Sequence, residues 1–148
     1  MAAKPLRTVV ETALDELLDE LGWPETRHEV GAVEIWQVPL PTDPDIVGLA
    51  ILFDTDARTL STYAMLGREA PPHRRREGAV FAAAAGHGAR FGAVEYDISD
   101  GSLRIRVDAE LEIRTAPEAV RRCVDRALTL ARQHGQRWRA FTLDETAS

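Results

Sequence analysis

The sequence predicts one α+β domain, a five-stranded antiparallel sheet with helices, in the order α-β-β-β-α-β-β-α. Three observations support this fold class. Two stretches near the ends of the chain place apolar residues at helical spacing, and three central stretches read as strands with short connections. A third feature, an Asp-Gly dipeptide between two alternating stretches, is typical of a hairpin. Short connections favour antiparallel neighbours, and helices grouped against such a sheet make an α+β sandwich.

Composition limits the class of protein. A chain of 148 residues supports one domain, which we expect to span residues 1–148 with a loose tail from about residue 144. The net charge of −6 argues against general nucleic-acid binding, which needs a basic surface. No stretch approaches the ~20 apolar residues that span a bilayer, and the first residues lack the apolar core of a signal peptide. We therefore expect a cytoplasmic bacterial protein that binds neither nucleic acid nor membrane.

The first helix is predicted by a capping box and an apolar repeat. Thr8 and Glu11 have the spacing at which each side chain can accept from the other's free backbone amide at a helix N-terminus. Gly22 predicts the end of this helix. The apolar positions at helical spacing are Val10, Ala13, Leu14, Leu17, Leu18 and Leu21. The outer positions are mostly acidic, so this helix should present negative charge to its surroundings.

Three strands are predicted over residues 33–38, 46–53 and 59–66. The middle stretch is apolar at every position, which is typical of a strand covered on both faces. In the polar loop 54–58 before the third strand, Asp54-Thr55-Asp56 resembles the opening of a calcium loop. The stretch lacks the later ligands of such a site, so a hairpin loop is favoured.

A second helix is predicted over residues 74–85, followed by a hairpin. The centre of this helix, from Ala79 to Ala85, has no polar face, and a helix that is apolar all round is usually buried all round. In the hairpin, Asp100-Gly101 predicts a two-residue turn, because both central residues of a type I′ turn need a positive φ. That turn places Tyr96 opposite Ile105 on the apolar side of the sheet.

The last helix has a second capping box, formed by Thr115 and Glu118, with Pro117 in its first turn. Gly135 predicts its end. The predicted buried stripe consists of Val120, Cys123, Val124, Ala127, Leu128 and Ala131. The lone Cys123 excludes an internal disulfide and a zinc site built from several cysteines. Because the outer face of this helix is basic and that of the first is acidic, we expect both helices on the same face of the sheet.

The C-terminal half resembles a known family. The residues that carry the resemblance are Arg90-Phe91-Gly92, Glu95-Tyr96-Asp97, Asp100-Gly101, Leu103-Arg104-Ile105-Arg106 and Thr115-Ala116-Pro117-Glu118. They resemble the YbjN-type sensory-transduction regulators, which share their fold with the chaperones of type III secretion systems. The resemblance covers roughly Gly86 to Phe141 by local pattern and the rest by the order of elements. It implies a dimeric, peptide-binding or regulatory module without catalytic residues.

The sequence favours a non-enzymatic, chaperone-like or regulatory module that binds a protein or peptide client without cofactor or metal. The apolar strands and the second helix offer more apolar surface than two amphipathic helices can cover. A homodimer through the second helix and the sheet surface beside it would hide that surface. The residues predicted to contact a partner are Trp36, Val38, Val80, Phe81, Ala83, Arg74 and Arg75.

An alternative is a small-ligand or anion-binding protein, or an enzyme, with a site around His73, Arg74–Arg76 and His87. Cations at a helix N-terminus oppose the helix dipole, so a bound anion would compensate them. The competing explanation of the same arginines is a solvated turn. A deep polar pocket that joins these residues would favour ligand binding, whereas a shallow apolar groove would favour polypeptide binding.

Overall fold

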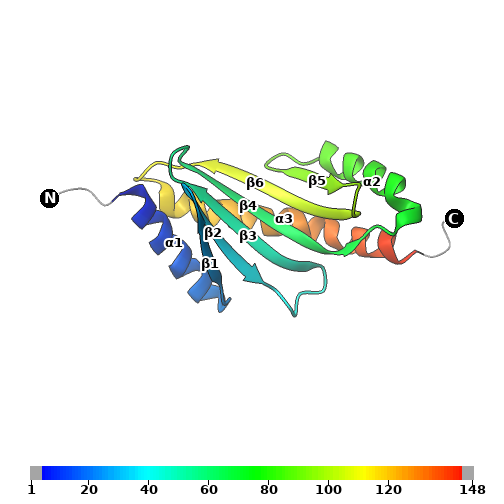
Figure 1. The fold of residues 1–148 in the computed structure, drawn as a ribbon, viewed down its shortest axis with the longest axis horizontal. Helices are drawn as coiled ribbons and strands as arrows, with labels where there is room; N and C mark the ends of the chain where they lie inside the picture. Colours follow the sequence, from blue (N-terminus) through cyan, green and yellow to red (C-terminus); the bar gives the residue numbers. More distant parts are fainter. Residues whose placement is uncertain (1–4, 145–148) are drawn as a thin grey trace.

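The computed structural model describes residues 5–144, which form an α+β fold (Figure 1). In chain order the elements are α1 (Leu6–Leu21), β1 (Thr26–Val30), β2 (Val33–Pro39), β3 (Ile46–Asp54), β4 (Thr59–Glu69), the 3-10 turn η1 (Pro72–Arg74), α2 (Arg75–His87), β5 (Ala93–Asp97), β6 (Ser102–Glu110) and α3 (Ala116–Leu143). The strands form one six-stranded antiparallel sheet in the order β1-β2-β3-β4-β6-β5. The predicted fold class is confirmed, with six strands in place of five.

The additional strand is β1, at the edge of the sheet. All five of its residues are exposed, so its sequence has none of the apolar alternation that identifies a half-buried strand. It pairs with β2 across a two-residue turn in which Gly31 has φ 60°, a conformation that glycine adopts without strain. Backbone pairing with β2, together with polar side-chain contacts of Arg27 and His28 to that strand, makes this segment a strand.

All three helices lie on one face of the sheet. Cys123 of α3 contacts the buried Thr62 hydroxyl of β4 at 3.3 Å, and α1 packs beside α3. Figure 1 shows α3 running behind the sheet. The expected placement of the first and last helices on one face is confirmed, and Arg121 Nη1 of α3 lies 2.8 Å from Glu20 Oε2 of α1. The expectation that the second helix is buried all round is wrong, because α2 packs on β5 and α3, through Tyr96 and Phe81, and leaves Val80 71% exposed.

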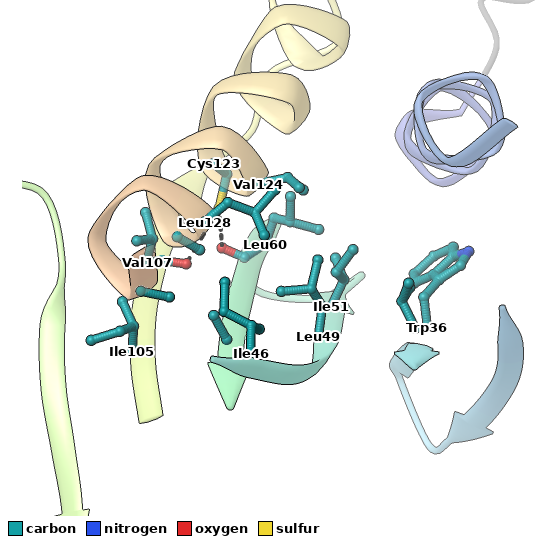
Figure 2. Close-up of a cluster of buried hydrophobic side chains, with 14 of the residues drawn as sticks. Trp36, Ile46, Leu49, Ile51, Leu60, Ile105, Val107, Cys123, Val124 and Leu128 are labelled. Carbon is teal, nitrogen blue, oxygen red and sulfur yellow. Dashed lines mark hydrogen bonds between the residues drawn. The ribbon is translucent and has the colours of Figure 1, made fainter. Parts of the chain in front are cut away.

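The core lies between this helical layer and the sheet (Figure 2). Side chains of β3 that point toward the helices, such as Leu49, Ile51 and Phe53, are fully buried. Those that point the other way, Ala50 and Leu52, are only half-buried. The expectation that this strand is covered on both faces is therefore wrong for the single chain, because no helix crosses its second face.

The N-terminus of α1 departs from the predicted capping box. The helix begins at Leu6, directly after Pro5, and Pro5 makes no side-chain cap. Glu11 instead accepts a hydrogen bond from Arg7 Nε at 2.9 Å, an i,i+4 pair one turn inside the helix. The end is as predicted, since Gly22 takes a left-handed conformation with φ 69°.

Helix α3 does not end at Gly135; it is 28 residues long and continues to Leu143. The glycine allows close packing, because a Cβ there would lie 2.7 Å from the Cβ of Asp45. Trp138 is consequently buried within the same helix and donates its indole N–H to the carbonyl of Arg68 at 2.8 Å. At the start of α3, Thr115 occupies the N-cap position without a side-chain hydrogen bond. The predicted loose tail lies, except for Asp144, outside the described residues.

The β5–β6 hairpin has a register two residues away from the predicted one. Asp97 pairs with Ser102, so the loop has four residues, and Tyr96 lies opposite Leu103 rather than Ile105. The side chain of Asp97 accepts the Ser99 amide at 2.9 Å, which fixes the longer loop. A shift of two residues keeps the paired side chains, Tyr96 among them, on their predicted face, but Ile98 lies in the loop and is 56% exposed.

Candidate functional site

Trp36 and Val38 were predicted to contact a partner, but both lie in the core. Their exposed fractions are 0% and 1%. They alternate along β2 with Val33 and Ile35, so they face the helices while Val33 and Ile35 face away. The prediction for Trp36 and Val38 is wrong because the helical layer covers the strand face that carries them.

Arg74 and Arg75 are used inside the fold. Arg74 is buried, donates from Nη1 to the carbonyl oxygens of Phe141 and Asp144, and places its guanidinium over the Phe141 ring at 3.9 Å. It therefore caps the C-terminal end of α3. Arg75 Nη1 donates to the carbonyl of Ser99 at 2.8 Å. Both guanidinium groups thus hold neighbouring backbone and are not free to form an anion site.

The remaining residues of the alternative site do not converge. His73 and Arg76 are exposed near the start of α2, whereas His87 is exposed at its other end. The 13 residues of α2 separate the two ends by roughly 18 Å at 1.5 Å per residue. The structure therefore brings His73 near the arginines but leaves His87 apart from them.

Helix α2 keeps an exposed apolar stripe. Phe81 faces inward and packs against the rings of Trp138 and Phe141, with centroids 5.2 and 5.4 Å away. Val80 is 71% exposed, and Ala83 and its neighbour Ala84 are also exposed. Of the residues predicted to contact a partner, Val80 and Ala83 are the two that this single chain leaves open.

The face of the sheet opposite the helices is bare. Its middle strands carry five half-buried apolar side chains, which we call the open-face strip: Ile35, Ala50, Leu52, Tyr63 and Met65. Strand register makes them neighbours, since Ile35 pairs with Leu52 and Ala50 pairs with Tyr63. The outer face of an antiparallel sheet is ordinarily polar. The sequence predicted uncovered apolar sheet surface but assigned it to Trp36 and Val38, which lie on the opposite face of β2. The alternation of β2, β3 and β4 carries the signal for the strip itself.

Charged residues of β5 and β6 flank the open-face strip. The Arg104 guanidinium lies 4.6 Å from the centre of the Tyr63 ring, and its Nε lies 2.6 Å from Glu95 Oε1. Arg106 also lies over Tyr63, at 5.5 Å, and pairs with Asp108 at 3.0 Å. The arginines are thereby fixed as one wall of the apolar surface.

A second surface lies on the helical side of the molecule. We call it the α3 groove, a cavity of about 850 Å³ over the outer side of α3, between α1 and the loop before β5. Its lining includes Leu17 of α1, Phe91 of the loop and Leu130 of α3. Phe91 is 57% exposed, and the guanidinium of Arg126 lies 4.1 Å from its ring centre. No local sequence pattern reveals this groove, because it is formed by three separate segments.

The buried titratable groups serve the fold. Cys123 is buried, as predicted for a small core residue, and burial raises the pKa of its thiol, which opposes nucleophilic reactivity. Glu34 is buried on the core face of β2 and pairs with Arg7 of α1 and Arg27 of β1. Burial, followed by its hydrogen bond with Glu11, raises the pKa of Glu34.

Residues 5–144 lack two features that would indicate other kinds of function. Residues 5–144 contain no group of three or more His, Cys, Asp or Glu side chains placed to hold a metal ion. None of the helices in the same range combines the length and apolar character needed to cross a bilayer.

Comparisons with known proteins identify the fold. No family model and no curated protein matches the sequence. Among solved structures, the chain is similar to YbjN, a "putative transcription regulator from E. coli", with a TM-score of 0.56 and 16% identity over 86% of this chain and 93% of that one. It also matches the ExsC–ExsE complex, with a TM-score of 0.49 and 14% identity over 98% of this chain and 100% of that one. The resemblance to YbjN-type proteins is confirmed at the level of the fold.

Proposed function

We propose that the protein is a non-enzymatic, chaperone-like or regulatory module that holds a partner polypeptide on the bare face of its sheet. The observation that carries this proposal is the open-face strip, five apolar side chains on three adjacent strands with no helix over them. Contiguous apolar surface of this kind marks protein-interaction sites. Arg104 and Arg106 beside Tyr63 add the aromatic and arginine groups that are enriched at the centres of interfaces.

The arrangement of charge around the strip supports a polypeptide partner rather than a small ligand. The strip is a sheet surface, not an enclosed cavity, and its charged residues lie along one side, on β5 and β6. An apolar centre with a charged rim is the usual anatomy of a protein interface. The guanidinium groups of Arg104 and Arg106 are already paired with carboxylates, so a partner need not neutralise them.

The test of this surface is a matched pair of substitutions in β2 and β3. Leu52→Glu places a charge in the middle of the open-face strip, whereas Gln37→Glu places one on the same face at an exposed polar position. Partner proteins are captured with tagged wild type from the native host and identified by mass spectrometry, with folding of each variant checked by circular dichroism. We expect Leu52→Glu to lose the captured proteins and Gln37→Glu to keep them. Equal capture by both variants would contradict the proposal.

We further propose that two copies associate through the exposed stripe of α2. Val80, Ala83 and Ala84 point away from the core, and small side chains let two helices approach closely. A symmetric pair would bury this stripe with one self-complementary surface. Sedimentation should show a dimer for wild type and a monomer for Ala83→Glu. A wild type that stays monomeric at micromolar concentration, or an Ala83→Glu variant that stays dimeric, would contradict this.

A further inference from the structure

The α3 groove is long, and it lies on the side of the molecule away from the open-face strip. The lining residues of α3 run from Pro117 to Gln133, which corresponds to roughly 24 Å along a helix that rises 1.5 Å per residue. The floor is this one helix, and the walls are α1 on one side and the loop with Gly88, Arg90 and Phe91 on the other. A trough of this length is suited to a polymer segment more than to a compact small molecule.

The walls determine which conformation such a segment can adopt. Helices α1 and α3 satisfy their backbone amides and carbonyls internally, so the trough offers side chains and almost no free backbone groups. An extended peptide would leave its own backbone groups unpaired when it displaced water from this surface. A helix satisfies its backbone itself and needs only an apolar stripe to match Leu17, Leu130 and Phe91.

The two walls differ in charge. Arg126 lies over Phe91, and Arg122, one turn earlier on α3, shares that side of the groove with Arg90 of the loop. On the opposite side, Arg121 is paired with Glu20 of α1, and the groove is lined there by Glu16 and Asp125. Glu118, one turn before Arg122, also lines that first side of the groove. The first wall therefore carries three arginines, one glutamate and the Phe91 ring and is net basic, whereas the second carries Glu16, Asp125 and the Arg121–Glu20 pair and is net acidic.

We propose that the α3 groove binds an amphipathic helix of a partner protein, which carries an apolar stripe, acidic residues along one edge and basic residues along the other. The acidic edge lies against Arg90, Arg122 and Arg126, and the apolar stripe packs on Phe91 and Leu130. The basic edge lies against Glu16 and Asp125. This site goes beyond the open-face strip, because it is formed by other residues on the helical side of the molecule.

The experiment uses a defined probe. An 18-residue, end-capped, fluorescein-labelled peptide is made with a leucine stripe, glutamates along one edge and lysines along the other. Two control peptides replace the glutamates with glutamine or place two prolines in the centre. Binding to full-length protein is measured by fluorescence anisotropy, and the site is mapped from NMR amide shifts. The first variant is a double substitution, Arg122→Glu with Arg126→Glu. The second variant, Arg132→Glu, is a control that reverses a charge on the exposed face of the same helix, outside the groove.

We expect the Arg122→Glu, Arg126→Glu variant to bind the probe about tenfold more weakly, since each reversed charge replaces an attraction by a repulsion. Arg132→Glu should stay within about twofold of wild type, because exposed charges outside the contact contribute little. Amide shifts should change at Thr129 and Gln133, and both control peptides should bind more weakly. The proposal is overturned if the glutamine peptide binds as tightly as the probe, or if the shifts fall on the open-face strip. It is equally overturned if the groove is closed by a second copy, seen as a dimer that the double variant dissociates.

Discussion

Gly78 of α2 is the position where a single methyl group should report most directly on the packing of the helical layer. It is buried against Tyr96 of β5, and an added Cβ would lie 2.8 Å from the Tyr96 ring carbon that bears the hydroxyl. The hydroxyl of Tyr96 donates to the carbonyl of Arg75 at 2.7 Å. Gly78→Ala therefore cannot be accommodated unless Tyr96 moves and this hydrogen bond is lost.

The expected change in stability follows from three contributions. Overpacking costs about 1–3 kcal/mol, and loss of the Tyr96 hydrogen bond costs about 0.5–1.5 kcal/mol. Replacing glycine by alanine inside a helix returns about 1 kcal/mol. The net loss in the free energy of unfolding is therefore about 0.5–3.5 kcal/mol, which corresponds to a fall in Tm of roughly 2–10 °C for a domain of this size.

The assay is urea unfolding of Gly78→Ala beside Gly86→Ala, the same change near the end of the same helix. A Cβ at Gly86 would meet Val94 at an ordinary 3.8 Å, so this control should be stabilised by about 0.4–1 kcal/mol. Tyr96→Phe should cost less in the Gly78→Ala background than in wild type, because it removes one of the clashing atoms. If Gly78→Ala is as stabilising as Gly86→Ala, Tyr96 does not pack on α2 as described.

Two further predictions concern charged groups inside the fold. The pKa of Glu34 is raised in the folded state. Between the ordinary pKa of a glutamate and this raised pKa, the folded protein binds more protons than the unfolded chain, so its free energy of unfolding falls as pH rises through that range. Urea unfolding at pH 4 and pH 7 should show Glu34→Gln gaining stability relative to wild type at the higher pH, and a constant or falling difference would contradict this. Arg74→Met should speed hydrogen exchange in the last turn of α3 around Phe141, while the exposed Arg76→Met should not. Equal exchange in the two variants would show that Arg74 is no cap.

Much of the fold could be predicted because the relevant interactions are local in sequence. Short stretches bounded by loops predicted strands over residues 33–38 and 59–66, which are β2 and β4, and Gly22 predicted the end of α1. Apolar spacing identified the buried stripe of α3. In each case residues close in sequence determine the local conformation, so one sequence is sufficient to predict the element.

The candidate surfaces depend on how elements assemble, and the sequence did not determine them. Strand β1 has no apolar pattern of its own and exists because β2 offers backbone partners. The apolar run of β3 indicated cover on both faces, yet α2 packs on β5 beside α3 and leaves the open-face strip bare. Gly135 was predicted to end the last helix, but it instead lets the helix pack closely against Asp45. That role cannot be inferred from the local sequence, because Asp45 is distant along the chain.

The sequence by itself therefore determined the class of fold, most of its elements and the faces of the β5–β6 hairpin, since these follow from periodicity and local backbone preference. Only the tertiary structure decided which apolar faces are covered. Trp36 and Ile35 are adjacent and both apolar, but the helical layer buries one and leaves the other on the open-face strip. A partner-binding surface is the apolar area left over after packing, and packing is a property of the whole chain.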